Sequence, residues 1–223
     1  MPELNNKIRE RLNKLATTNI SDALDALGLK GATYGIRPIV EIKGTPKIVG
    51  EAVTIKITAA GLTKSKHHLG VKAIDFAKRG DVIVIDNGGR IDTSCWGDVL
   101  ANGAKAKGIS GVVIDGACRD VDAYIEINFP VYARGSVVAT ARGRIMEEAT
   151  NVIIQFGGVQ VRPGDIVVGD YSGVVIIPKE KLEEVISKAE ELYEKEEKMI
   201  ADIKAGKSML EIDNKYNYEN MLK

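Results

Sequence analysis

Cysteine and histidine are scarce in this chain of 223 residues, which contains two of each. Cys95 and Cys118 lie far apart and form no C-x-x-C pattern, so neither a zinc site nor a disulfide framework is expected. A chain of this length buries roughly 70–75% of its unfolded surface and needs no such crosslink to fold. The sparse cysteine fits a reducing compartment, and we expect a cytoplasmic protein.

The chain also lacks an excess of charge and a long apolar run. Lysine plus arginine and aspartate plus glutamate number 31 each, so the overall balance offers no basic face for a nucleic acid. Residues 1–14 carry charges at nearly every other position and resemble neither a signal peptide nor a membrane span. No linker-like stretch separates the periodic segments. We therefore expect a single domain over residues 1–223, with no membrane or nucleic-acid partner.

Apolar periodicity predicts an α/β order of elements. The pattern predicts helices over about 4–15, 69–78, 96–107 and 180–205, strands over 50–60, 82–85 and 111–115, and short strands over 152–156, 159–161, 166–168 and 173–177. Ser21 is expected to cap a short helix that ends at Gly28, and a polar tail, 206–223, follows the last helix. The two buried strands around the helix at 96–107 predict a βαβ crossover.

Charged side chains gather in the two loops that follow these buried strands. The first loop carries Asp86, Arg90, Asp92 and Asp98, and the second carries Asp115, Arg119 and Asp120. Such loops meet at one edge of an open α/β sheet, which is where ligands bind. Carboxylates without histidine or paired cysteine favour Mg²⁺ or Mn²⁺ over zinc or copper.

A 2-oxo acid could bind at the same edge. Backbone N–H groups at the start of the helix near Trp96 could hold a substrate carboxylate, and Arg119 could bind a second oxygen with its planar fork. The alternative stays open at this point, because an aspartate at a strand end is commonly a turn former and an Arg-Asp dipeptide is commonly a surface ion pair.

The segment 80–120, GDVIVIDNGGRIDTSCWGDVLANGAKAKGISGVVIDGACRD, resembles the core of the RraA-like family. That family includes the 4-hydroxy-4-methyl-2-oxoglutarate aldolases and the regulator of ribonuclease E activity A. Its signature is an aspartate, twenty intervening residues and then Arg-Asp, which Asp98 and Arg119-Asp120 match in spacing. The resemblance extends from SDALDALG near Ser21 to the C-terminal helix. It implies a layered, swivelling-type β/β/α core flanked by helices.

The resemblance also implies a role for each site residue. Asp120 would bind a divalent ion, Mg²⁺ or Mn²⁺, directly, and Asp98 would hold it through water. Arg119 would contact the pyruvyl group, and the helix start would complete the substrate site with Gly97, Asp98, Val99 and Leu100. The ion and Arg119 would stabilise the pyruvate enolate that forms when the C3–C4 bond breaks. Loss of carbon dioxide from oxaloacetate forms the same enolate.

The aldolases of the family also use a glutamate from a neighbouring subunit's C-terminal region, for which Glu196 and Glu197 are candidates. The apolar stripe of the last helix reads Leu182, Val185/Ile186, Ala189, Leu192/Tyr193, Met199/Ile200 and Ile203, and the position missing from it is 196. Glu196 therefore interrupts a buried face, whereas Glu197 points toward solvent. Glu196 would serve the neighbour's metal through water in a homotrimer or homohexamer, or form a salt bridge to a neighbour's lysine.

Other conspicuous residues are interpreted as structural. His67 and His68 are expected at the surface or at a helix start. Cys95 and Trp96 are expected to pack in the core, since no histidine beside them would activate the thiol.

The resemblance therefore implies a lyase: a class II, metal-dependent aldolase for a 4-hydroxy-2-oxo acid, or an oxaloacetate decarboxylase. Its alternative is a non-catalytic regulator that binds ribonuclease E or a related RNA-processing assembly. The family also includes modules that work beside a sugar-phosphate enzyme, but the sequence shows no fused partner. The C-terminal helix with Glu196 favours the lyase.

Overall fold

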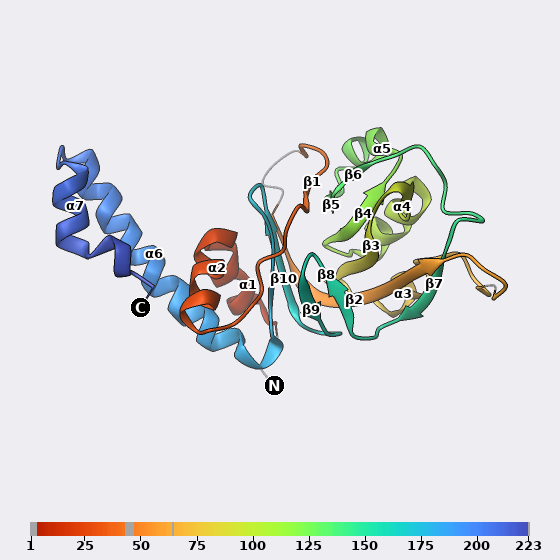
Figure 1. The fold of residues 1–223 in the computed structure, drawn as a ribbon, viewed down its shortest axis with the longest axis horizontal. Coiled ribbons are helices and arrows are strands. Elements are labelled where there is room, and N and C mark those ends of the chain that lie inside the picture. The colour runs from red at the N-terminus through yellow and green to blue at the C-terminus, as the bar shows by residue number, and fades with distance from the viewer. Residues whose placement is uncertain (1–3, 43–46, 64, 223) are drawn as a thin grey trace.

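The computed structural model describes residues 4–42, 47–63 and 65–222 (Figure 1). The helices are α1 (Asn6–Lys14), α2 (Thr17–Ala26), α3 (Val71–Phe76), α4 (Asp98–Lys107), α5 (Val121–Glu126), α6 (Leu182–Lys204) and α7 (Met209–Tyr216), with short 3₁₀ turns η1 (Lys179–Lys181) and η2 (Tyr218–Asn220). The strands are β1 (Arg37–Pro38), β2 (Ile48–Ala59), β3 (Val82–Ser94), β4 (Gly111–Cys118), β5 (Val131–Ala133), β6 (Gly135–Ser136), β7 (Ile145–Thr150), β8 (Ile154–Phe156), β9 (Val159–Val161), β10 (Ile166–Asp170) and β11 (Gly173–Ile177).

One sheet organises the fold. Across the described residues its strands run in the order β1-β5-β4-β3-β2-β10-β11, with β6 paired to β4 and β7 paired to β2. The central strands β2, β3, β4 and β5 are parallel, whereas β1, β7, β10 and β11 pair antiparallel. Since β3 and β4 are parallel neighbours joined by α4, the predicted βαβ crossover is confirmed.

The segment 31–38 brings the two edges of this sheet together. At one edge the Ile176 N–H donates to the Gly31 carbonyl at 2.8 Å, and the Thr33 N–H donates to the Val174 carbonyl at 3.2 Å. At the other edge β1 pairs with β5. A Cβ at Gly31 would lie 2.2 Å from the Ile176 oxygen, so only glycine permits this approach. The sheet is thus nearly closed into a barrel.

Alternating side chains divide the core into layers. Val82 and Val84 belong to the apolar cluster inside the nearly closed barrel. Side chains of the β8–β9 hairpin belong to the same cluster. Ile83 and Ile85 face the other way, toward α3, α4 and α5. A third cluster packs α1, α2 and α6 on β10 and β11. The predicted α/β fold, a layered β core flanked by helices, is confirmed.

Several elements differ from the sequence expectation. The second helix begins at Thr17 rather than at a Ser21 cap, because Asp170 at the end of β10 accepts from the Thr17 N–H at 2.8 Å. β3 and β4 continue beyond the apolar runs that predicted them, to Ser94 and Cys118. The segment after 206 forms α7, which Ser208 caps and whose Ile212 is buried. No helix within the described ranges is long and apolar enough to cross a membrane.

Candidate active site

The connections after β3 and β4 lie side by side and build the site. The Cys95 N–H donates to the Ala117 carbonyl at 3.0 Å, and the Arg119 N–H donates to the Trp96 carbonyl at 2.9 Å. The buried Tyr124 hydroxyl donates to the same Trp96 oxygen at 3.3 Å. These bonds bring Asp98, at the start of α4, next to the Arg119-Asp120 pair before α5.

Asp120 reaches back to the first turn of α4. Its backbone is left-handed, with φ 56° and ψ 44°, a conformation that aspartate tolerates better than most residues. Its Oδ2 accepts from the Asp98 N–H at 3.1 Å and lies 3.3 Å from the Arg119 Nε. The side chain of Asp120 keeps 36% of its surface exposed, so a ligand can still reach its carboxylate.

Gly97 is necessary for this arrangement. A Cβ at that position would lie 2.6 Å from the Asp120 Oδ2 and 3.2 Å from the Arg119 Nε. Because the backbone of Gly97 is extended, the requirement comes from the lack of space and not from a positive φ. Any side chain at position 97 would displace the carboxylate of Asp120.

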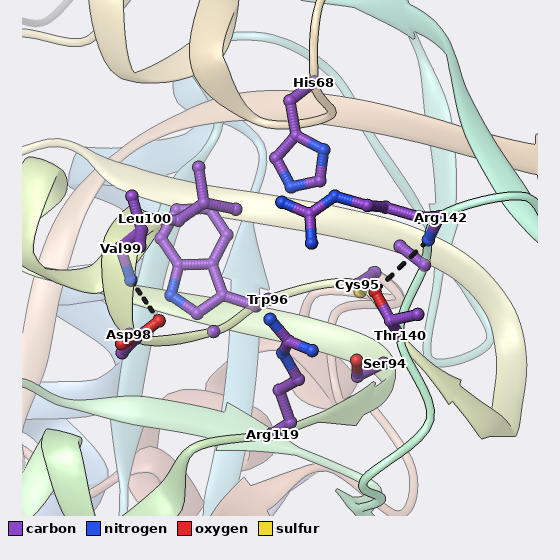
Figure 2. Close-up of a pocket in the computed structure, with 12 residues that line it drawn as sticks. His68, Ser94, Cys95, Trp96, Asp98, Val99, Leu100, Arg119, Thr140 and Arg142 are labelled. Atoms are coloured by element: carbon purple, nitrogen blue, oxygen red, sulfur yellow. Dashed lines mark hydrogen bonds between the residues drawn. The ribbon is translucent and has the colours of Figure 1, made fainter.

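The start of α4 is not the open row of N–H donors that the sequence led us to expect. The Asp98 N–H is bonded to Asp120, and the Val99 N–H donates to the Asp98 Oδ1 at 2.7 Å (Figure 2). Carboxylate side chains therefore already occupy the first two donors of the helix. An incoming anion would have to displace the Asp98 side chain to use the second.

A pocket of about 100 Å³ lies beside this turn, and four segments of the chain line it. Its lining residues are His68, Ser94, Cys95, Trp96, Gly97, Asp98, Val99, Leu100, Arg119, Thr140, Ala141 and Arg142. Figure 2 shows His68, Arg119 and Arg142 entering the same space from different segments, beside the ring of Trp96. The five residues predicted to bind substrate, 97–100 and Arg119, all line it. Asp120 instead lines an adjoining hollow of about 340 Å³, which Arg119 also borders.

Arg119 and Arg142 line the pocket together with the carboxylate of Asp98. Partial burial and then the charges of Arg142 and Arg119 hold the pKa of His68 below its usual value. Burial raises the pKa of the Cys95 thiol far above neutrality, and that of Cys118 to about 11. Both thiols therefore stay protonated at neutral pH, in agreement with the packing role expected for Cys95. The Trp96 indole N–H is buried and has no hydrogen-bond partner in the described part of the chain.

Other carboxylates expected at this edge serve the fold instead. Asp115 is buried, forms an ion pair with Arg134 and accepts from the Gly157 N–H at 2.8 Å, which anchors the β8–β9 turn. The Asp86 Oδ1 accepts from the Gly88 N–H at 3.0 Å in its own turn. Arg90 and Asp92 lie on the outer part of β3 and do not line the pocket. The expected convergence thus holds only for Asp98, Arg119 and Asp120.

Sequence reasoning missed the far wall of the pocket. Arg142, Thr140 and Ala141 come from the connection before β7, and no motif marks them. His68 is exposed, as expected, but it also lines the pocket. Its position could not follow from its own neighbours in the sequence, because the opposite wall comes from residues more than 70 positions away.

Glu196 belongs to α6. This helix lies on the other side of the β core from α4 and α5 (Figure 1). It is partly buried, and its Oε2 accepts from the Asn19 Nδ2 at 2.6 Å, so its partner in this chain is an amide of α2. Glu197 is exposed, as predicted. Within the described ranges, no three His, Cys, Asp or Glu residues of one chain gather closely enough to hold a metal ion.

Comparison with known proteins identifies the family. Residues 17–176 match the model of the RraA-like family, described as Aldolase/RraA, and the chain belongs to this family. The resemblance drawn from residues 80–120 is thereby confirmed. The match spans Asp98, Arg119 and Asp120 but ends before α6 and Glu196.

Similar proteins carry different descriptions. A Halalkalibacterium halodurans protein named "Putative 4-hydroxy-4-methyl-2-oxoglutarate aldolase" is 42% identical over 176 residues, 78% of each chain. Protein DlpA of Legionella pneumophila is 33% identical over 94% of this chain, which spans only 34% of that protein's length. The structure of Streptomyces coelicolor RraAS2, described as an unusual member of the RNase ES inhibitor RraA protein family, matches with a TM-score of 0.78 and 26% identity, covering 88% of this chain and 97% of that one.

Proposed function

We propose that this protein is a divalent-metal-dependent lyase that breaks the C3–C4 bond of a 2-oxo acid and releases pyruvate through its enolate. The observation that carries the proposal is the meeting of Asp98, Arg119 and Asp120 at one pocket edge. The aldolase name of the H. halodurans relative supports the same reaction class. We expect an aldolase of the 4-hydroxy-4-methyl-2-oxoglutarate type, an oxaloacetate decarboxylase, or both, in the cytoplasm.

The donors at this edge fit Mg²⁺ or Mn²⁺. Asp98 and Asp120 offer only oxygen atoms, and such ions bind through one or two carboxylates while keeping several waters. Asp120 would hold the ion directly and Asp98 through water. The ion would polarise the 2-oxo group and stabilise negative charge on its oxygen.

The chain's own side chains supply binding and proton transfer. The Arg119 side chain is 34% exposed, so its planar fork can bind the pyruvyl carboxylate or 2-oxo oxygen. Trp96 and Leu100 form an apolar wall that limits water around the reacting carbons. Aldol cleavage requires loss of the C4 hydroxyl proton and later protonation of C3, whereas decarboxylation of oxaloacetate releases C4 as carbon dioxide and requires only the protonation of C3. We assign these transfers to water held by Asp98 and Glu196.

Glu196 would act on a neighbouring subunit's site in a homotrimer or homohexamer. Asn19 holds one of its carboxylate oxygens, and the described residues show no partner for the other. The surrounding part of α6 projects from the β core (Figure 1) and leaves Tyr193, Ile200 and Ile203 between 36% and 42% exposed. A second copy of the chain could cover this apolar surface and meet Glu196 there.

The direct test is pyruvate release from 4-hydroxy-4-methyl-2-oxoglutarate and from oxaloacetate, each with Mg²⁺, with Mn²⁺ and with EDTA. We expect turnover with either metal and its loss in EDTA. Turnover that resists the chelator would contradict the metal mechanism.

The second candidate is the non-catalytic regulator, and the structural similarity to RraAS2 favours it. In that case neither substrate would be turned over, and the protein would bind and inhibit a ribonuclease E. A binding assay with purified ribonuclease E, run beside the pyruvate assay, separates the two functions.

A further inference from the structure

The pocket beside Arg119 continues into a larger hollow. This second hollow measures about 410 Å³ and is lined by parts of the segments 60–69 and 141–147. His68, Ala141 and Arg142 line both spaces, so they stand where the two meet. A ligand whose pyruvyl end lies at Arg119 would therefore extend past His68 and Arg142.

Arg142 has no acidic partner among the residues that the structure describes. Other arginines do: Arg11 pairs with Glu183 and Glu190, and Arg162 pairs with Asp165 and Glu180. Arg142 instead faces Arg119 and His68 across the pocket (Figure 2). Like charges that converge on one cavity repel each other unless an anion lies between them.

Recognition of a pyruvyl group requires Arg119 but leaves Arg142, the second cation of the pocket, without a role. One arginine satisfies the carboxylate or the 2-oxo oxygen of a pyruvyl group, and its Nε already contacts Asp120 at 3.3 Å. A guanidinium on the opposite wall, next to a roomier hollow, suits a second anionic group further along the ligand.

We propose that Arg142, assisted by His68, binds the second carboxylate of a 2-oxo dicarboxylic acid, the one attached to C4. This assignment rests on the proposed function and names the residues of this chain that would select a substrate with that carboxylate. The hollow beyond Arg142 would accept the remaining C4 substituent. When the C3–C4 bond breaks, its electron pair forms the enolate, the C4 hydroxyl becomes a carbonyl as its proton leaves, and the second carboxylate stays on the departing fragment. Arg142 thus contributes to substrate recognition without taking part in the chemistry.

A matched pair of unreactive ligands tests the assignment without turnover. 2-Oxoglutarate and 2-oxopentanoate have equal chain length and share the 2-oxo acid end, but only 2-oxoglutarate has the second carboxylate. By calorimetry with Mg²⁺ present, we expect the wild-type protein to bind 2-oxoglutarate roughly tenfold more tightly. Arg142→Gln should remove this preference and leave the affinity for 2-oxopentanoate unchanged.

Arg144→Gln is the control, because Arg144 is also exposed, lies two residues away and donates to the Thr140 carbonyl rather than lining either space. Arg144→Gln should still bind 2-oxoglutarate more tightly than 2-oxopentanoate. Equal weakening of both ligands by Arg142→Gln, or no preference in the wild type, would overturn the assignment.

Kinetics give a second readout. With 4-hydroxy-4-methyl-2-oxoglutarate, Arg142→Gln should raise KM roughly tenfold with little change in kcat, and with 4-hydroxy-4-methyl-2-oxopentanoate it should change neither. If the wild type releases no pyruvate but still prefers 2-oxoglutarate through Arg142, the lyase proposal fails and the carboxylate site stands. If pyruvate is released and the preference is absent, the carboxylate site alone fails.

Discussion

At the scale of single residues, the site depends on a close contact between two neighbouring turns. Asp120 adopts a left-handed backbone and places its carboxylate against the first N–H of α4. The missing side chain of Gly97 leaves the space that this carboxylate occupies. The two residues should therefore behave as one functional unit.

Gly97→Ala should damage the metal site by displacing Asp120, because the added Cβ would lie 2.6 Å from the Asp120 Oδ2. We expect Gly97→Ala and Asp120→Ala each to abolish Mn²⁺ binding and turnover. The double variant should be no worse than Asp120→Ala, since residues in contact are not additive. Calorimetric titration with Mn²⁺ measures the metal affinity of the wild type, the two single variants and the double variant.

Asp120→Asn controls for structure, because asparagine also tolerates the left-handed backbone and keeps a hydrogen-bond acceptor. Urea unfolding without metal should show losses of no more than about 2 kcal/mol for these variants, the scale of one helix cap plus local strain. A much larger loss would mean that Asp120 chiefly supports the fold. Unchanged Mn²⁺ binding in Gly97→Ala would show that the position of Asp120 does not matter.

At this scale the sequence correctly predicted which residues lie close together where those residues share a local motif. Asp98, Arg119 and Asp120 belong to one βαβ unit, whose strand ends must meet at one edge. Asp115 precedes Arg119 by only four residues, yet its Oδ2 accepts from the Gly157 N–H and its side chain serves the β8–β9 turn instead of the pocket. His68 and Arg142 escaped prediction because only tertiary packing brings their segments together.

At the scale of elements, α2 and α6 hold the candidate glutamate between them. The Asn19 Oδ1 accepts from the Ala16 N–H at 3.0 Å at the start of α2, while its Nδ2 donates to Glu196 on α6. One amide thus satisfies a helix terminus and orients a carboxylate on another helix. The helical periodicity of α6 indicated that Glu196 was unusual, but it could not identify Asn19 as its partner.

Asn19→Ala should lower kcat by freeing the Glu196 side chain, while leaving Mn²⁺ affinity nearly unchanged. The loss of the hydrogen bond from the Ala16 N–H should also cost about 1 kcal/mol of stability, measured by urea unfolding. Asn19→Asp is the sharper variant, because it can still cap α2 but places a negative charge beside Glu196. Full activity in Asn19→Asp would show that the orientation of Glu196 is not needed for the reaction.

At the scale of the whole molecule, α6, the helix of Glu196, lies across the β core from α4 (Figure 1), and no residue of α6 lines the pocket. A role for Glu196 in catalysis then requires a second subunit. Glu196→Ala and Asp120→Ala oligomers should each be nearly inactive, since every site in either one lacks a carboxylate. Random reassembly of equal amounts should restore about one site in four, by pairing Asp120 from one parent with Glu196 from the other.

The hybrids must be verified by mass, and the two parents mixed without dissociation serve as the control. Pyruvate release should return toward a quarter of the wild-type rate. If verified hybrids stay as inactive as their parents, Glu196 acts within its own subunit or takes no part in the reaction.

The sequence by itself determined the α/β class, the βαβ unit and the local set of Asp98, Arg119 and Asp120. Each of these follows from apolar periodicity or from short spacings, which depend only on neighbouring residues. Only the tertiary structure decided that segment 31–38 joins the sheet edges, that Asp170 caps α2, and that His68 and Arg142 complete the pocket. Those contacts join residues dozens of positions apart, and no local pattern encodes them, because their partners are set by how the layers pack.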